Sequence, residues 1–182
     1  MTLLFISFVW FLSEIILSGL LRSQTKSDLD QSSLSVLWIT IILSTSIGIY
    51  LHFLGIGQLD YLPLLFYYVG ILLIFVGLVI RWIAILTLKK FFTVNVSVSE
   101  EQIIIRSGIY KSIRHPSYLG SLLSFLGLGL AFGNWLTVMI IFIPICFAFL
   151  YRIKVEEYTL SKVFPDYSDY MQSTKRLIPG VY

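Results

Sequence analysis

The chain has 182 residues, of which 57% are hydrophobic and only 13% are charged, and its formal net charge is +3. Soluble domains contain about 25% charged residues, so this composition excludes a soluble protein of this length. The length fits a single domain, residues 1–182, without room for a separate soluble catalytic domain. The sequence therefore predicts an all-α integral membrane protein whose functional site is built from helices and their connections.

Five apolar segments follow one another along the chain. A helix needs about 20 apolar residues to cross the hydrocarbon core of a bilayer. The predicted spans are residues 2–21, 34–54, 62–88, 118–132 and 135–151. Gly133-Asn134 is a turn signal, so the last two spans are expected to form an antiparallel helical hairpin. Glycines in the fourth span permit close helix packing in lipid, and these are Gly120, Gly127 and Gly129.

The basic residues support this count of spans. Five spans place residues 22–33, 89–117 and 152–182 on one side of the membrane, and these segments hold twelve of the thirteen Lys and Arg residues. Arg81 is the thirteenth and lies inside the third span. Under the positive-inside rule the charged side is cytosolic. The segments 89–117 and 152–182 are therefore expected to be cytosolic, and they are the places where chemistry can be sought.

The start of the fourth span is the first candidate site. Pro116 suits the first turn of a helix, and the unpaired amides that follow it can hold an anionic group. Arg114 and His115 add a permanent and a titratable positive charge at the same place. An interfacial anchor explains the same two residues equally well.

The end of the fifth span is the second candidate site. Arg152 and Glu156 are four residues apart, so they share one face of a helix. An ordinary surface ion pair is the alternative, but adjacent acids such as Glu156 and Glu157 are costly where a helix leaves the lipid. Arg81 either extends toward the cytosolic face or faces the bundle and pairs with an acid, and nearby Gly77 favours the bundle.

Motifs of soluble enzymes are absent from the sequence. It has no P-loop, no GxGxxG before a helix, no nucleophile elbow, no HExxH and no cluster of Cys and His for a metal. A soluble nucleotide-binding fold and a metal site are therefore not expected.

The C-terminal half resembles a known family of membrane enzymes. The residues that carry the resemblance are Gly108-Ile109-Tyr110, Arg114-His115-Pro116-Ser117-Tyr118-Leu119-Gly120, Glu156-Glu157, Phe164, Tyr167, Tyr170 and Arg176-Leu177-Ile178-Pro179-Gly180. This succession, over about residues 77–182, is similar to the isoprenylcysteine carboxyl methyltransferase family and its phospholipid methyltransferase relatives. The chain looks like a short, prokaryotic-type member, because it lacks the extra N-terminal spans of the eukaryotic enzymes.

The resemblance implies an S-adenosylmethionine-dependent methyl transfer at the cytosolic membrane face, without a metal. It places the cofactor in a cytosolic pocket formed by the fourth and fifth spans and the segments 89–117 and 152–182. It assigns cofactor contacts to Asn95, Gln102, Ile103, Ile104, Ile105, Tyr110, His115, Pro116, Ser117, Tyr118 and Glu156. It assigns a catalytic role to Arg152, which would hold the carboxylate of the substrate. The implied partner is a prenylated or other lipophilic substrate that reaches the site from the bilayer of a prokaryotic cell membrane, with no nucleic acid involved.

Three other functions remain open on the sequence. A lipid amine methyltransferase would need a general base, for which Glu157 is the candidate. An NADPH-dependent sterol-type reductase shares an RHPxYxG-like element and an Ile-Pro-Gly-x-Tyr ending, although Glu156-Glu157 and Phe164-Pro165-Asp166 favour methyl transfer. The third alternative is a non-catalytic membrane protein that has kept the fold.

Overall fold

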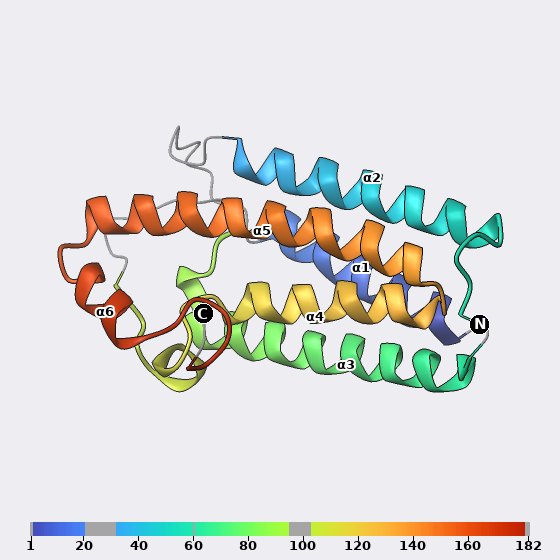
Figure 1. Cartoon of the computed structure of the whole chain (residues 1–182). Coiled ribbons are helices and arrows are strands. Elements are labelled where there is room, and N and C mark those ends of the chain that lie inside the picture. Colours follow the sequence, from blue (N-terminus) through green and yellow to red (C-terminus); the bar gives the residue numbers. More distant parts are fainter. Residues whose placement is uncertain (1, 21–31, 60, 95–102, 181–182) are drawn as a thin grey trace.

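The protein is a bundle of long helices, with the segments 103–115 and 164–180 at one end and the connection that follows residue 53 at the other (Figure 1). The computed structural model describes residues 2–20, 32–59, 61–94 and 103–180. The helices are α1 (Thr2–Leu20), α2 (Ser33–Phe53), α3 (Pro63–Leu88), α4 (Pro116–Ala131), α5 (Trp135–Val163) and α6 (Tyr167–Ser173), with short 3-10 helices η2 (Lys89–Phe91) and η3 (Gly108–Lys111). In these residues, β-structure is limited to isolated bridges. The predicted all-α membrane fold is confirmed.

The helices α1 to α5 lie at the five predicted apolar segments. Within the described ranges, α2, α3 and α5 are long and apolar enough to cross a membrane, whereas α4 is a shorter apolar helix of 16 residues. The predicted number of spans stays a prediction. Helix α5 continues 12 residues beyond position 151, where the fifth span was expected to end, so Arg152, Glu156 and Glu157 lie on a helix that projects past its apolar part.

The helices α3 and α4 are packed closely through glycines. A Cβ atom on Gly77 would lie 2.4 Å from the carbonyl oxygen of Gly120, and one on Gly127 would lie 2.5 Å from that of Gly70. These distances are shorter than any real Cβ contact, so only glycine allows the two backbones to approach this closely. The close approach fixes the start of α4 against α3.

The turn between α4 and α5 is the predicted Gly133-Asn134 hairpin. Asn134 is fully buried and caps α5, because its Oδ1 accepts from the Thr137 N–H at 3.0 Å while its Nδ2 donates to the Ile56 carbonyl at 2.7 Å. Thr137 Oγ1 in turn donates to the Gly48 carbonyl at 3.0 Å, which ties α5 to α2. One side chain therefore joins the hairpin to the connection that follows α2.

Replacing Asn134 with alanine is expected to lower the free energy of unfolding by about 2 kcal/mol, because the cap is lost and the Ile56 carbonyl loses its donor. Asn134→Ser is the matched control: serine keeps a cap acceptor but cannot reach Ile56, so it is expected to lose less. Thermal unfolding in detergent measures both variants. Equal melting temperatures for the wild type and the alanine variant would contradict this account of the hairpin.

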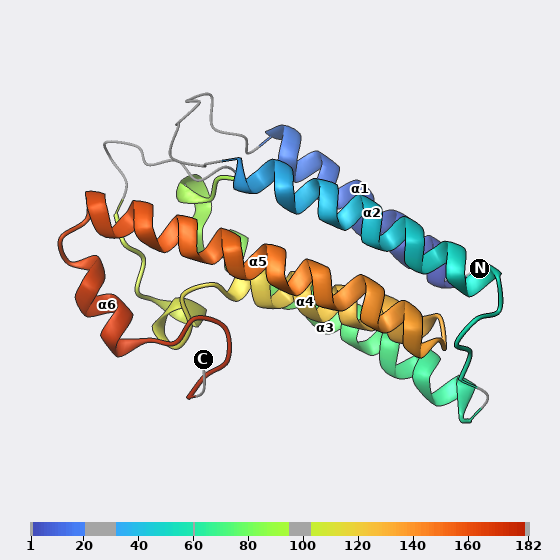
Figure 2. The ribbon, with the colours of Figure 1, turned by 45° about the horizontal axis from the view of Figure 1, so that its top comes forward.

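Figure 2 shows α1 and α2 on one side of α5, with α3 and α4 on the other. The Trp10 ring of α1 packs edge-on against Phe125 of α4, with 4.8 Å between ring centroids. The N-terminus lies at the end of the bundle opposite to α6 and the C-terminal segment (Figures 1 and 2). The polar segments 103–115 and 164–180 thus meet at one end, where both cytosolic segments were expected to meet.

Candidate functional site

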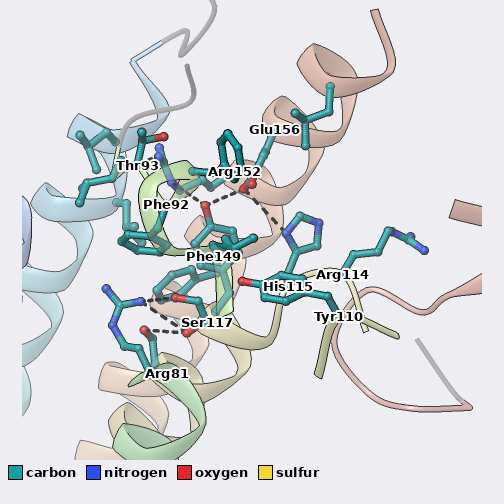
Figure 3. A pocket seen from close by; sticks show the side chains of 18 of the residues that line it. Arg81, Phe92, Thr93, Tyr110, Arg114, His115, Ser117, Phe149, Arg152 and Glu156 are labelled. Atoms are coloured by element: carbon teal, nitrogen blue, oxygen red, sulfur yellow. Dashed lines mark hydrogen bonds and ion pairs between the residues drawn. The ribbon is translucent and has the colours of Figure 1, made fainter. Parts of the chain in front are cut away.

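A cavity opens among the helices at the end that carries the polar segments (Figure 3). Its walls come from α1, α2, α3, α4 and α5, from the connection after α3 and from the region around α6. Of the residues expected from the sequence, it is lined by Ile103, Ile104, Ile105, Tyr110, His115, Ser117, Tyr118, Arg152 and Glu156. Pro116 and Glu157 are not among the described residues that line it. Asn95 and Gln102 lie outside the described residues.

The C-terminal segment holds the start of α4 through the backbone. The Arg114 N–H donates to the Lys175 carbonyl at 2.8 Å, and the His115 N–H donates to the Arg176 carbonyl at 3.0 Å. Pro116 then occupies the first turn of α4, as predicted. The side chain of His115 is buried and lies parallel to the Tyr118 ring, with 5.5 Å between centroids. The candidate site thus combines segments about 60 residues apart in the chain.

Glu157 binds two arginines and contacts His115 beside the cavity. Its Oε1 accepts from Arg114 Nε at 2.8 Å and lies 3.4 Å from His115 Nε2, and its Oε2 accepts from Arg176 Nε at 2.9 Å. Arg114 also donates to the carbonyls of Met171 and Thr174. Glu157 is only 5% exposed, so its carboxylate serves to join the start of α4, the end of α5 and the C-terminal segment.

The pKa of Glu157 reflects this arrangement. Burial raises the pKa, but hydrogen bonds and positive charge from His115 and Arg114 outweigh burial and lower it from 4.5 to about 2. The ionised carboxylate therefore stabilises the folded state at every pH above 4.5, and this stabilisation is lost as the pH falls from 4.5 toward about 2.

Acid is therefore expected to remove the difference in stability between the wild type and Glu157→Gln. Melting temperatures measured in detergent at a series of pH values should show a wild-type advantage at neutral pH that shrinks below pH 4.5. A difference in melting temperature that stays constant through that range would mean that the charge of Glu157 contributes nothing to the stability of the folded state.

Tyr118 connects the two other predicted charged residues. Its hydroxyl donates to Glu156 Oε2 at 2.7 Å and accepts from Arg152 Nε at 3.1 Å. Arg152 is 2% exposed and also donates from Nη1 to Ser33 Oγ at 2.8 Å, and from Nη2 to the Val94 carbonyl. The expected pairing of Arg152 with Glu156 is thus bridged by the Tyr118 hydroxyl. Glu156 remains 28% exposed, with His115 Nδ1 at 3.7 Å from its Oε2.

Tyrosines form another part of the wall. The Tyr170 hydroxyl donates to the Tyr110 carbonyl at 2.7 Å, which attaches α6 to η3. Burial raises the pKa values of Tyr110 and Tyr167, and it raises that of Tyr170 to about 12. These phenols therefore stay neutral at physiological pH and give the cavity aromatic faces without added negative charge.

Arg81 faces the bundle and pairs with an acid, as the sequence favoured. Its Nε and Nη2 bind the two carboxylate oxygens of Glu14 in α1, and its Nη1 donates to Ser117 Oγ at 2.7 Å. Sequence reasoning did not identify Glu14, although an acid within an apolar span was a signal for a functional or paired residue. It also missed the aromatic lining residues Trp10, Phe125 and Phe149, which look like any other core residue in an apolar helix.

Comparison with known proteins tests the predicted family. The model of the isoprenylcysteine carboxyl methyltransferase (ICMT) family matches residues 69–162, which is just over half of the chain. The chain belongs to the ICMT family. The matched region of this ICMT-family chain contains most of α3, all of α4 and nearly all of α5, and with them Arg81, the Arg114–Tyr118 element, Arg152, Glu156 and Glu157.

Individual relatives include two isoprenylcysteine methyltransferases and one protein with a different name. Protein-S-isoprenylcysteine O-methyltransferase A of Arabidopsis thaliana is 31% identical over 115 residues, which are 62% of this chain and 58% of the plant protein. The solved eukaryotic intramembrane Ras methyltransferase ICMT matches with a TM-score of 0.58 and 26% identity over 86% of this chain and 54% of its own. The cobalt-zinc-cadmium resistance protein CzcN of Cupriavidus metallidurans is 35% identical over 78 residues, 42% of this chain and 35% of that protein.

This ICMT-family chain spans less than two thirds of these relatives: 58% of the Arabidopsis protein and 54% of the solved enzyme. The part that matches the family model contains α4, α5 and their charged ends, which form much of the cavity. The shared part therefore supplies much of the cavity wall, and α1, α2 and the region around α6 supply the rest.

Proposed function

We propose that this protein is an S-adenosylmethionine-dependent carboxyl O-methyltransferase that acts on a lipophilic substrate at the cytosolic face of a membrane. The observation that carries the proposal is the cavity lined by Tyr118, Arg152 and Glu156 within the region that matches the ICMT family. The distribution of the Lys and Arg residues supports the cytosolic orientation, and the apolar composition supports a multi-pass membrane protein. Its location in a prokaryotic cell membrane stays a prediction.

The chemistry of the cavity fits the methyl donor. Glu156 presents a partly exposed carboxylate that suits the ammonium group of its methionine part. The N-terminal end of α4, which begins at Pro116 directly after His115, carries the positive end of the helix dipole, which suits the carboxylate. Ile104, Ile105 and Tyr110 supply apolar and aromatic surface for the adenosine, together with Ile103. Contacts from Asn95 and Gln102 stay predictions.

The donor, when bound, supplies a methyl group on a positively charged sulfur. Tyrosine faces in the wall attract such a charge. The oxygen of an ionised carboxylate is already a nucleophile, so the protein has to align it and exclude water rather than deprotonate it. We assign the alignment of the acceptor to Arg152. Its bonds to Tyr118, Ser33 and Val94 hold the guanidinium in one orientation beside Glu156.

The surroundings of Glu157 favour a carboxylate over an amine as the acceptor. Methylation of an amine requires a base, and Glu157 was the candidate. Its carboxylate is bound by Arg114, His115 and Arg176, and its low pKa makes it a weak base. We therefore assign Glu157 a positioning role rather than the catalytic role expected from the sequence.

The apolar part of the cavity supports a lipophilic acceptor. Its lining includes Trp10 of α1, Leu37 and Ile41 of α2 and Phe125 of α4, and both α1 and α2 carry large exposed apolar side chains on their outer faces. Such a surface suits lipid, and a prenyl or other hydrocarbon chain would reach the cavity sideways from the bilayer. The acceptor we propose is a carboxylate that carries such a chain.

The proposal is tested by calorimetric binding of S-adenosylhomocysteine and NADPH to the purified protein in detergent. We expect the adenosyl ligand to bind to the wild type, and Glu156→Gln to weaken it by about tenfold or more, since a charge-assisted hydrogen bond is lost. Asp169→Asn, an exposed acid on α6, is the matched control and should bind normally. Binding of NADPH alone would indicate a reductase. If neither ligand bound, both the methyltransferase and the reductase function would be contradicted.

A further inference from the structure

Helix α5 continues beyond the end of α4 at the side of the bundle where α6 lies (Figure 1). It has 29 residues, from Trp135 to Val163. At a rise of about 1.5 Å per residue, this helix is about 44 Å long. A bilayer is about 40–45 Å thick when its head-group layers are included. Helix α5 is therefore long enough to cross the hydrocarbon core and to keep its C-terminal part among the lipid head groups.

One face of α5 is exposed along most of the helix, and we call it the α5 stripe. Its exposed side chains are Ile143, Phe147, Tyr151, Lys154, Tyr158 and Lys162. Successive members are three or four residues apart, so they are neighbours on the helix surface. The stripe begins apolar and becomes aromatic and basic toward the C-terminal end of α5. Apolar side chains suit lipid tails, whereas tyrosine and lysine suit the interface with water.

The α5 stripe lies on the other side of the helix from the candidate site. Arg152 and Glu156 are among the described residues that line the cavity, and the members of the stripe are not. At 3.6 residues per turn, Arg152 and Glu156 lie about 120–160° around the helix from Lys154 and Tyr158. The stripe therefore has no part in the proposed mechanism, and its exposed side chains can be replaced without changing the cavity wall.

The basic end of the stripe offers two positive charges to a partner. Neither Lys154 nor Lys162 forms an ion pair with an acid in the part of the chain that the structure describes. Lys162 Nζ lies 4.2 Å from the centroid of the Tyr158 ring, so its ammonium group is held one turn back along the helix, toward Lys154. Tyr158 is 52% exposed and carries a hydroxyl that can donate a hydrogen bond. This end of the stripe can therefore bind an anion.

The position of the stripe indicates which anion it meets. Ile143 and Phe147 suit lipid tails, and the head groups of the same lipids follow along the same face. Basic side chains close to a membrane-spanning helix attract anionic lipids, and lysine binds phosphate as a point charge. A soluble acidic protein fits this surface less well, because the first half of the stripe is apolar. Charge and continuity with the lipid-facing part of α5 thus favour a phospholipid.

We propose that Lys154, Tyr158 and Lys162 form a binding site for the head group of an anionic phospholipid in the leaflet next to the candidate site. The two ammonium groups bind the negatively charged head group, and the Tyr158 hydroxyl donates to a phosphate oxygen. The acyl chains lie along Phe147 and Tyr151. The bound lipid holds the C-terminal part of α5 at the level of the head groups. Lipid binding at this place does not depend on the reaction in the cavity.

Native mass spectrometry of the full chain in a nonionic detergent tests this site. The protein is mixed with equal amounts of dioleoylphosphatidylglycerol, which is anionic, and dioleoylphosphatidylcholine, which has the same acyl chains and no net charge. We expect the wild type to retain the anionic lipid about tenfold more than the neutral one, because both lysines attract it. The double variant Lys154→Gln with Lys162→Gln should reduce this preference to about twofold or less.

Two further double variants serve as controls. Lys111→Gln with Lys175→Gln removes the same two charges from exposed positions outside α5 and should keep the wild-type preference. Lys154→Arg with Lys162→Arg keeps both charges on the stripe and should also keep the preference. All four lysines are exposed, so the melting temperatures of the variants should match that of the wild type.

Three results would overturn the inference. The first is equal retention of the two lipids by the wild type. The second is an equal loss of preference in the Lys111 and Lys175 variant, because net charge alone would then explain the selectivity. The third is an unchanged lipid preference in the Lys154→Gln, Lys162→Gln variant together with a changed proportion of dimers, which would make the α5 stripe an interface between copies of this chain.

Discussion

Replacement of Glu157 with glutamine is expected to lower the free energy of unfolding by about 3 kcal/mol, because it leaves the buried Arg114 guanidinium without its carboxylate. Binding of S-adenosylhomocysteine is expected to fall at the same time. The backbone of Arg114 and His115 is held by the C-terminal segment, and Glu157 fixes both side chains against that segment. Thermal unfolding and calorimetry on the same preparation measure the two effects.

The adjacent acid provides the matched comparison. Glu156 is partly exposed and bound by Tyr118, so Glu156→Gln is expected to weaken ligand binding with little change in the melting temperature. A Glu157→Gln protein with the wild-type melting temperature and ligand affinity, but a reduced rate of methyl transfer, would instead identify Glu157 as a general base. The pair of variants thus separates a positioning residue from a catalytic one.

Replacement of Gly120 with valine is expected to prevent the native packing of α3 against α4. A Cβ atom at this position would lie 2.5 Å from the Gly77 carbonyl oxygen and 2.7 Å from the Arg81 amide nitrogen. Both are backbone atoms that cannot rotate away, so the helices have to separate. Overpacking of this kind costs about 3 kcal/mol or more. The displacement also moves Ser117, one turn earlier, away from Arg81.

The expected readout is the loss of a cooperative thermal transition, or a strongly lowered melting temperature, together with the loss of ligand binding. Val79→Leu is the control, since it adds a carbon atom to an exposed position of α3 and should leave both properties unchanged. A Gly120→Val protein with the same melting temperature as the wild type would show that the close approach of α3 and α4 contributes little to stability.

Much of the fold was predictable because it depends on local patterns. Apolar runs of sufficient length identify helices α1 to α5, since a membrane helix satisfies its backbone hydrogen bonds within one segment. Gly133-Asn134 identified the hairpin, because both residues favour a turn and asparagine caps the helix that follows. The extension of α5 past position 151 was less clear, because a charged continuation of an apolar helix has no distinctive pattern.

The partners of the charged residues were not predictable to the same degree. The acid that pairs with Arg81 comes from α1, 67 residues earlier, and the sequence contains no signal that joins the two. Arg114 and Glu157 are 43 residues apart, and the adjacent Glu156 looked like the same kind of residue. Only the three-dimensional packing distinguishes the two adjacent acids: Glu156 lines the cavity, whereas Glu157 binds Arg114 and Arg176.

The attachment of residues 174–176 to the start of α4 has a consequence for biosynthesis. The ribosome makes these residues after the long helices α1 to α5, so all of those helices can form before the start of α4 has its partners in the C-terminal segment. The carbonyls of Lys175 and Arg176 then order Arg114 and His115. The ordered start of α4 is therefore acquired as a separate, late step of maturation, and a nascent chain released before Thr174 would hold its long helices without these two backbone hydrogen bonds.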